Sequence, residues 1–334
     1  MDETREMLGA TVERLLAPHC TSSKLLEAEV GVWPAALWTA LEQAGLTRAL
    51  LPEASGGAGL DPEQALSLVR AAGRHAAPVP LAETMMAGWL LAGAGLDIPD
   101  GPLTILPTQS GDHPTLVREG AGWRVAGLVR RVPWGRHAIA AAAPIEVAGK
   151  TLVALVPAAG WSATPGANLA GEPRDTLSLD ALVPHAAVAP AASGTDRAAL
   201  HRLGAAMRSL AIAGALETVL SLSVEYAQQR VQFGRPIGKF QAIQQNLAIL
   251  AGQSVAAGAA SDIAAESFTT GLPLAGIAAA KIRAGEAAGI AAGIAHQVHG
   301  AIGFTQEHRL HFFTKRLWSW RDEFGSEAAW SLAL

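Results

Sequence analysis

Residues 228–245 read QQRVQFGRPIGKFQAIQQ, a basic and aromatic stretch between two long apolar helical patterns. Arg230 ends the first pattern, Phe233 follows it, and Gly234-Arg235-Pro236 predicts a turn before the second pattern. A guanidinium can donate two parallel N–H bonds to a phosphate, and a neighbouring aromatic face can cover a planar ring. A polar corner between helices would explain the stretch; an extended anionic cofactor is the functional interpretation.

A second group of reactive residues lies near the C-terminus. The run FFTKRLWSWRDEFGSEAAW gathers six aromatic residues around Asp322, Glu323 and Glu327. A capping helix with solvated acids would account for it. The functional interpretation is a carboxylate whose pKa is raised by an apolar pocket, which could serve as a general base.

Several other kinds of site are disfavoured. His296/His299 and His308/His311 form two H-x-x-H pairs that could each share a helix face, but no carboxylate completes either pair, so we expect no metal site. The sequence has no P-loop, no G-x-G-x-x-G and no G-x-S-x-G. The commonest nucleotide-binding and hydrolase motifs are therefore missing.

Composition indicates a heavily buried protein. Hydrophobic residues make up 50% of the 334 residues and charged residues 16%, which favours an oligomer. The net charge is −4 without a basic block, so nucleic-acid binding is not expected. Cys20 is the only cysteine, which fits a reducing compartment. The N-terminus lacks a signal-like apolar region and the apolar runs are short or interrupted, so we expect a cytoplasmic protein without membrane spans.

The chain divides into three regions by pattern. Residues 1–98 predict a helical domain, with helices over 34–45, about 62–75 and 81–94. Residues 99–193 contain short strand-like runs such as TLVALVP and predict a small β-domain. Residues 194–334 again carry long helical patterns rich in alanine and glycine. This order predicts an α+β fold, mostly α, with segregated helical and β domains.

Three motifs carry a resemblance to a known family. YAQQRVQFGRPIGKFQAIQQNLA, GLTRALLPEASGGAGLD and QVHGAIGFTQEHRLHFFTKR resemble, in the right order, motifs of the acyl-CoA dehydrogenase family. The resemblance implies a helical N-terminal domain, a central β-barrel-like domain and a C-terminal four-helix bundle. It also implies FAD bound at a subunit interface, usually in a tetramer.

The resemblance assigns cofactor-binding roles to five residues. Arg230 matches the family arginine that reaches the FAD pyrophosphate of a neighbouring subunit, and Gln232 and Phe233 match positions beside the same cofactor. Gln297 and Gly300 match the glutamine and first glycine of the loop that receives the adenosine end.

The middle region departs from the family pattern. The motif T-E-P-x-A-G-S-D is not recognisable where this chain reads LPTQSGDHPTLV. The flavin-contacting W-I-T-N stretch is replaced by RVPW, residues 131–134. We therefore expect flavin-ring and acyl-CoA contacts from the β-domain to be remade or absent.

The positions of the catalytic base also depart from the family pattern. The family's glutamate, in an E-G-T-S-like context, aligns with Phe324, while Gly325 and Ser326 match the next two positions; we count Ser326 among the cofactor-binding residues. The family's other location for the base falls at about Gly204. Glu323 is the nearest carboxylate and Asp322 the second candidate.

These residues lead to one main hypothesis, an FAD-dependent acyl-CoA dehydrogenase of lipid metabolism. A carboxylate would remove the α-proton of an acyl-CoA thioester while flavin takes the β-hydride, giving a 2-enoyl-CoA. An electron-transfer-flavoprotein-like carrier would then accept the electrons, and the assembly would be a homotetramer or a heterotetramer with a related chain. The alternatives are a non-catalytic or half-site subunit of a heteromeric acyl-CoA dehydrogenase, and a flavin-dependent monooxygenase on the same fold.

Overall fold

The computed structural model describes residues 2–107 and 111–334, with side chains from residue 9 onward. By its internal contacts the chain divides into two compact units. Unit 1 comprises Met1–Leu26, Leu66–Ala77 and Gly204–Leu334, and unit 2 comprises Glu27–Ala65 and Pro78–Leu203. The domain borders near residues 98 and 193 stay a prediction.

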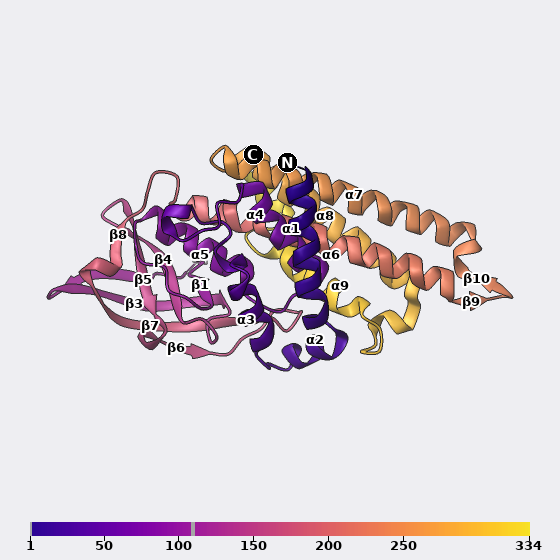
Figure 1. Ribbon diagram of the computed structural model, residues 1–334, viewed down its shortest axis with the longest axis horizontal. Helices are drawn as coiled ribbons and strands as arrows, with labels where there is room; N and C mark the ends of the chain where they lie inside the picture. The colour runs from indigo at the N-terminus through magenta and orange to yellow at the C-terminus, as the bar shows by residue number, and fades with distance from the viewer. Residues whose placement is uncertain (1, 108–110) are drawn as a thin grey trace. The chain divides into compact units, whose positions relative to one another are not determined.

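Unit 1 is helical and contains most of the long alanine-rich helices. Its elements are α1 (Asp2–Leu16), parts of α2 (Ser22–Glu29) and α4 (Pro62–Arg74), most of α6 (Arg197–Gln229), α7 (Gln241–Thr269), α8 (Leu274–His299), α9 (Leu310–Asp322) and α10 (Glu327–Ala333). The helices α7 and α8 pack side by side, as Figure 1 shows, with small residues along their contact. Alanine and glycine allow helix axes to approach closely, which explains their density in this half of the sequence.

Two glycines set the crossing of α4 and α6. A Cβ on Gly214 would lie 1.9 Å from the Arg70 carbonyl oxygen, and a Cβ on Gly73 would lie 2.2 Å from that of Ala211. Because the obstacle is backbone in both cases, no side-chain movement could make room. The crossing therefore requires glycine on both helices.

Charged residues tie the same helices together. The guanidinium groups of Arg70 and Arg74 each donate from Nε to the Glu217 carboxylate at 2.7 Å. Arg74 also donates to Glu13 of α1 at 2.6 Å. One carboxylate of α6 is thus shared by two arginines of α4, which fixes the rotation of α4 about its own axis.

Unit 2 combines two helices with two β-sheets. The helices are α3 (Ala35–Gln43) and α5 (Leu81–Gly93), close to the predicted ranges. The strands are β1 (Leu103–Ile105), β2 (Thr115–Glu119), β3 (Gly122–Pro133), β4 (Ala140–Val147), β5 (Lys150–Pro157), β6 (Trp161–Thr164), β7 (Arg174–Pro184) and β8 (Val188–Pro190). They pair in the orders β1-β4-β5-β8 and β2-β3-β7-β6.

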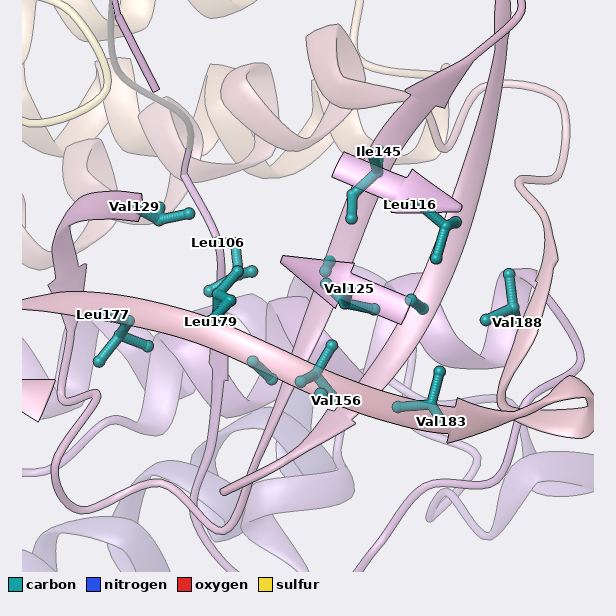
Figure 2. Close-up of a cluster of buried hydrophobic side chains, with 14 of the residues drawn as sticks. Leu106, Leu116, Val125, Val129, Ile145, Val156, Leu177, Leu179, Val183 and Val188 are labelled. Carbon is teal, nitrogen blue, oxygen red and sulfur yellow. The ribbon is translucent and has the colours of Figure 1, made fainter. Parts of the chain in front are cut away.

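The expectation of a barrel-like middle domain was wrong. The two four-stranded sheets stay open, because their edge strands do not hydrogen-bond to each other within the described residues. Their inner faces share one core, drawn in Figure 2, to which Val125, Leu177 and Val183 contribute from one sheet and Ile145 and Val156 from the other. The arrangement is a small sandwich, whose core comes from two facing sheets rather than from closure of one.

Strand β7 shows why the sequence forms this layer. From Leu177 to Pro184 buried and exposed residues alternate strictly, with Leu177, Leu179 and Val183 inward and Leu182 outward. This period of two places one face of the strand in the shared core. The short strand-like run that predicted a strand here is therefore confirmed.

Two helices differ from the expectation that every apolar run is short or interrupted. By length and composition α6 and α7 could each cross a membrane, with windows of mean hydropathy 1.4 and 1.3. The window in α6 is 83% buried inside the protein, as expected of a core helix, whereas that in α7 is 39% buried. The density of alanine, leucine and isoleucine explains the two hydropathy values. The lower buried share of α7 means that its apolar face is incompletely covered within this chain.

Candidate cofactor arm and candidate base segment

The basic stretch at 228–245 forms a projecting hairpin. Helix α6 ends at Gln229, strands β9 (Val231–Gln232) and β10 (Arg235–Pro236) pair antiparallel, and α7 begins at Gln241. Figure 1 shows the hairpin at the far end of α6 and α7. We call residues 230–240 the cofactor arm.

The tip of the cofactor arm is strained and uncovered. Phe233 has φ 51° and Gly234 has φ 79°, so both turn residues are left-handed. For phenylalanine this conformation is uncommon and costs about 1 kcal/mol or more. The Phe233 side chain is nevertheless 93% exposed. The ring meets only the Phe240 ring at an edge, with centroids 6.1 Å apart, among the described residues. Strain together with exposure makes Phe233 a candidate for contact with another molecule.

The two arginines of the cofactor arm differ in what they contact. The Arg235 guanidinium lies 4.3 Å from the centre of the Phe240 ring. The Arg230 guanidinium is exposed and makes no hydrogen bond or ion pair with the side chains described, those of residues 9–107 and 111–334, or with their backbone. Gln232 is exposed and its amide donates to the Val231 carbonyl at 2.7 Å. Arg230 can therefore bind an anion without first breaking an internal ion pair.

The predicted adenosine loop lies at the end of α8. The helix ends at His299, and Gly300 follows with φ 64° and ψ −144°, a conformation that glycine readily adopts. Gln297 and Gly300 are both exposed. Both residues remain accessible to a ligand, and both lie in unit 1 with the cofactor arm.

Glu323, the first candidate for the base, is held in an ion pair. Its carboxylate accepts from Arg208 Nε at 2.7 Å, and the two side chains are 5% and 9% exposed, Arg208 being the more buried. Asp322, the second candidate, is exposed at the end of α9. A carboxylate that neutralises a buried guanidinium must break that pair before it can accept a proton from a substrate.

The two family positions for the base meet in space. A Cβ on Gly204 would lie 2.2 Å from Cδ1 of Phe324, so the phenylalanine ring lies directly against the glycine. The Arg208 guanidinium, one helical turn beyond Gly204, lies 5.7 Å from the centre of the same ring. An aromatic ring therefore fills the space between Gly204 and the Arg208 guanidinium.

Several contacts fasten the segment that carries Phe324, residues 321–327, which we call the base segment. The Lys281 ammonium donates to the carbonyl oxygens of Arg321 and Gly325 at 2.5 and 2.8 Å. The Trp330 indole N–H donates to the Phe324 carbonyl oxygen at 2.9 Å. These bonds hold the base segment on both sides of Phe324, whose φ of 54° is also left-handed.

Burial governs the chemistry of Lys281. Its side chain is fully buried, and burial lowers the pKa of Lys281 to about 8, although the nearby acids Glu327, Glu323 and Asp322 act in the opposite direction.

Ser326, predicted to bind cofactor, caps α10 by accepting a hydrogen bond from the Ala329 amide at 3.4 Å. Its role toward a cofactor stays a prediction.

In the middle region, the stretch RVPW at residues 131–134 packs against other residues of unit 2. Arg131 and Trp134 each have φ 56°, and the pairing of β3 with β7 shifts register between Val129 and Val132. The Trp134 ring is buried and packs against Trp33 and His137, with ring centroids 6.1 and 5.9 Å away. The region LPTQSGDHPTLV includes residues 108–110, which lie outside the described residues.

Some important residues escaped the sequence analysis. Arg208 and Lys281 reach the base segment from distant parts of the chain, and a lysine within an alanine-rich helix was the only visible signal for either. No group of three or more metal-ligating side chains is found in the described part of the chain.

Comparison with known proteins identifies the family. The acyl-CoA dehydrogenase N-terminal domain matches residues 2–97 and the C-terminal domain residues 195–321. Acyl-CoA dehydrogenase IpdE2 of Mycobacterium tuberculosis is 32% identical over 94% of this chain and 91% of its own length. Acyl-CoA dehydrogenase FadE27 of the same organism is 32% identical over 74% of this chain and 70% of its own length.

Solved structures agree with that assignment. A chain of the Tcur3481-Tcur3483 steroid ACAD G363A variant has a TM-score of 0.89 and 25% identity, covering 100% of this chain and 97% of its own. A chain of the ChsE4-ChsE5 complex from Mycobacterium tuberculosis has a TM-score of 0.85 and 26% identity, covering 99% and 96%. The chain therefore belongs to the acyl-CoA dehydrogenase family, FAD-dependent oxidoreductases that act on acyl-CoA.

Proposed function

We propose that this chain is one subunit of a heteromeric acyl-CoA dehydrogenase. It contributes Arg230, Gln232 and Phe233 of the cofactor arm, with Gln297 and Gly300, to FAD that a related chain also holds. The related chain supplies the carboxylate that takes the α-proton of the acyl-CoA. FAD, when bound, supplies the acceptor for the β-hydride, and the product is a 2-enoyl-CoA. An electron-transfer-flavoprotein-like carrier then accepts the electrons.

The observation that carries this proposal is the contact between Gly204 and Phe324. Each stands where the family places a catalytic carboxylate, and neither side chain can accept a proton. The Phe324 ring also fills the space beside Gly204. The function that fits these residues is cofactor binding without proton abstraction.

The cofactor arm suits the anionic part of FAD. An exposed arginine without an internal partner can donate two N–H groups to a pyrophosphate. The exposed Phe233 ring beside it offers an apolar face to a planar group. The segment 226–261 contains Arg230, Arg235 and Lys239 and no acidic residue, so its charge attracts a phosphate group.

The rest of the chain supports an arrangement shared between two chains. Trp134, which stands in the family's flavin-contacting stretch, is taken up by packing with Trp33 and His137. Helix α7 exposes Ile249, Val255 and Ile263, an apolar stripe that fits association with another chain. The similar structures named above include chains from complexes of two differently named proteins.

Purification with and without a partner tests the proposal. The chain is expressed alone and together with an acyl-CoA dehydrogenase-like chain from the same genome, and the flavin absorbance is recorded before and after adding a panel of acyl-CoA thioesters. We expect little flavin in the protein alone, and flavin that is bleached by acyl-CoA in the co-expressed pair. A lone chain that forms a fully flavinylated, active homotetramer would overturn the proposal.

A second candidate is a chain that dehydrogenates acyl-CoA by itself, with Glu323 as the base. Its support is the position of Glu323, one residue from the family's glutamate. The carboxylate would have to leave Arg208 when substrate binds. Glu323→Gln separates the two candidates, because it abolishes turnover if Glu323 is the base and leaves turnover of the pair intact if the partner supplies it. A cytoplasmic location stays a prediction for both.

A further inference from the structure

Two segments of unit 1 that are distant in sequence are joined by aromatic rings. The rings of Tyr226 in α6 and His299 in α8 are stacked, with centroids 4.6 Å apart and planes at 22°. The His308 ring meets both at an edge, 4.6 Å from His299 and 5.9 Å from Tyr226. This cluster lies at the end of α6 and the end of α8, where the two predicted FAD-binding segments begin.

Each stacked ring is coupled to one of those segments. Tyr226 lies one helical turn before Arg230, whose backbone N–H donates to the Tyr226 carbonyl oxygen at 2.8 Å. Residues four apart share a helix face, so the direction of the Tyr226 ring is tied to the start of the cofactor arm. His299 is the last residue of α8 and stands between Gln297 and Gly300.

The His299 ring is fixed and neutral in this environment. Nδ1–H donates to the Ala295 carbonyl oxygen at 2.7 Å, and the side chain is 3% exposed. Burial lowers the pKa of His299, and His308 and His296 lower it further, whereas the carbonyls of Ala295 and Leu222 oppose them. A neutral, immobile imidazole is a suitable stacking partner for a tyrosine ring.

We propose that Tyr226 and His299 are positioning residues for FAD. Their stack holds the end of α6, which carries Arg230, against the end of α8, which carries Gln297 and Gly300, so that both segments meet the same cofactor. The inference rests on the proposed function, because it assumes that these segments bind FAD. It adds two residues that need not touch the cofactor themselves.

The first test measures FAD affinity in the co-expressed pair. We expect His299→Ala to weaken FAD binding about tenfold and His299→Phe, which keeps a stacking ring, to stay within about twofold of the wild type. His311→Ala is the matched control: His311 is 5% exposed, its ring contacts Phe312, and its Nδ1–H donates to the backbone carbonyl of His308, so it touches neither stacked ring. It removes a buried imidazole from the same region and should leave FAD affinity unchanged.

The second test needs no cofactor, because Tyr226 is the only tyrosine among the 334 residues. Incorporation of 3-fluorotyrosine into the full chain therefore gives one ¹⁹F resonance that reports on the stack. We expect His299→Ala to shift and broaden this resonance, and His311→Ala to leave it near the wild-type position. If the chemical shift and line width of this resonance are unchanged in His299→Ala, the inference is overturned, even if that variant binds FAD poorly.

The outcomes also distinguish this inference from the proposed function. If Arg230→Ala leaves FAD affinity unchanged, the proposed function fails whatever His299 does. If Arg230→Ala weakens FAD binding while His299→Ala in folded protein does not, only the positioning role fails. Equal losses in His299→Ala and His311→Ala, in proportion to their lowered melting temperatures, would show a purely structural role and would refute the positioning role too.

Discussion

The cofactor arm and the base segment have opposite designs, although both belong to unit 1. In the cofactor arm, Phe233 and Arg230 are exposed and Arg230 has no internal partner among the described residues. In the base segment, Glu323 is paired with Arg208, and Phe324 packs on Gly204. The cofactor arm has groups available to another molecule, whereas the groups of the base segment contact one another. Under the proposed function, this difference separates cofactor binding from proton abstraction within one fold.

The largest expected effect concerns the cofactor arm. Arg230→Ala should weaken FAD binding about a hundredfold, roughly 3 kcal/mol, because a charge-assisted pair of hydrogen bonds is lost. Arg235→Ala is the matched control, since that guanidinium already lies over Phe240 and should matter far less. Fluorescence of released flavin in the co-expressed pair measures both. Equal effects of the two substitutions would remove the distinction between the two arginines.

The next effect concerns Lys281 in the base segment. Burial lowers the pKa of Lys281 from an ordinary 10.5 to about 8. Below pH 8 the amine is charged in both states, whereas between 8 and 10.5 only the unfolded chain holds the proton. The free energy of unfolding therefore rises with pH through this window, by up to about 3 kcal/mol.

Comparison with Lys281→Met isolates that contribution. Burial also raises the pKa of Cys20 to about 12, which lowers stability above its ordinary value of 9.0 and opposes the Lys281 effect. The Cys20 contribution is the same in wild type and Lys281→Met, so it cancels in their difference. In urea unfolding from pH 7.5 to 10.5, the free energy of unfolding of the wild type should increase relative to that of Lys281→Met. A constant difference would mean that the amine is not buried as described.

A smaller effect is expected from the contact of Gly204 with Phe324. Gly204→Ala places a methyl group 2.2 Å from the ring and should destabilise the protein by roughly 2 kcal/mol. In a Phe324→Ala background the same substitution should cost little, because the ring that it meets is gone. Urea unfolding of the four proteins gives the coupling energy. Additive effects would show that the ring does not occupy this place.

The smallest effect follows from the histidines near the cofactor arm. Burial lowers the pKa of both His299 and His308 below the ordinary 6.5. Their stabilising contribution is complete above pH 6.5 and is lost as the pH falls, because the unfolded chain binds protons first. Thermal unfolding at pH 7 and pH 5 measures this effect. We expect the melting temperature of His308→Phe to fall less than that of the wild type between these pH values. His113 is exposed, so His113→Asn is the control and should behave like the wild type.

The sequence predicted the helices well because their patterns are local. The ranges expected over 34–45, 62–75 and 81–94 correspond to α3, α4 and α5 within a few residues. The family motifs also singled out the stretch that forms the hairpin between α6 and α7, whose role toward a cofactor stays a prediction. Closure of a sheet depends on which edges pair, and this cannot be read from strand patterns, so the barrel-like expectation failed.

The base segment was predicted only in part, because its contacts also join residues that are distant in sequence. That Gly204 and Phe324 lack a carboxylate is visible in the sequence, but their contact joins residues far apart in the chain. The Arg208–Glu323 ion pair likewise spans 115 positions. Such contacts depend on how α6, α8 and α9 pack, and no local propensity encodes that packing.

The exposed hairpin has a consequence for a cell that makes this chain. Its backbone can be cleaved by trypsin-like proteases after Arg230 and Lys239, both exposed, whereas Pro236 protects the bond after Arg235. In the proposed pair, FAD and the related chain would cover these bonds, whereas a molecule alone would leave them open to cleavage. Excess copies of this chain would then be removed first.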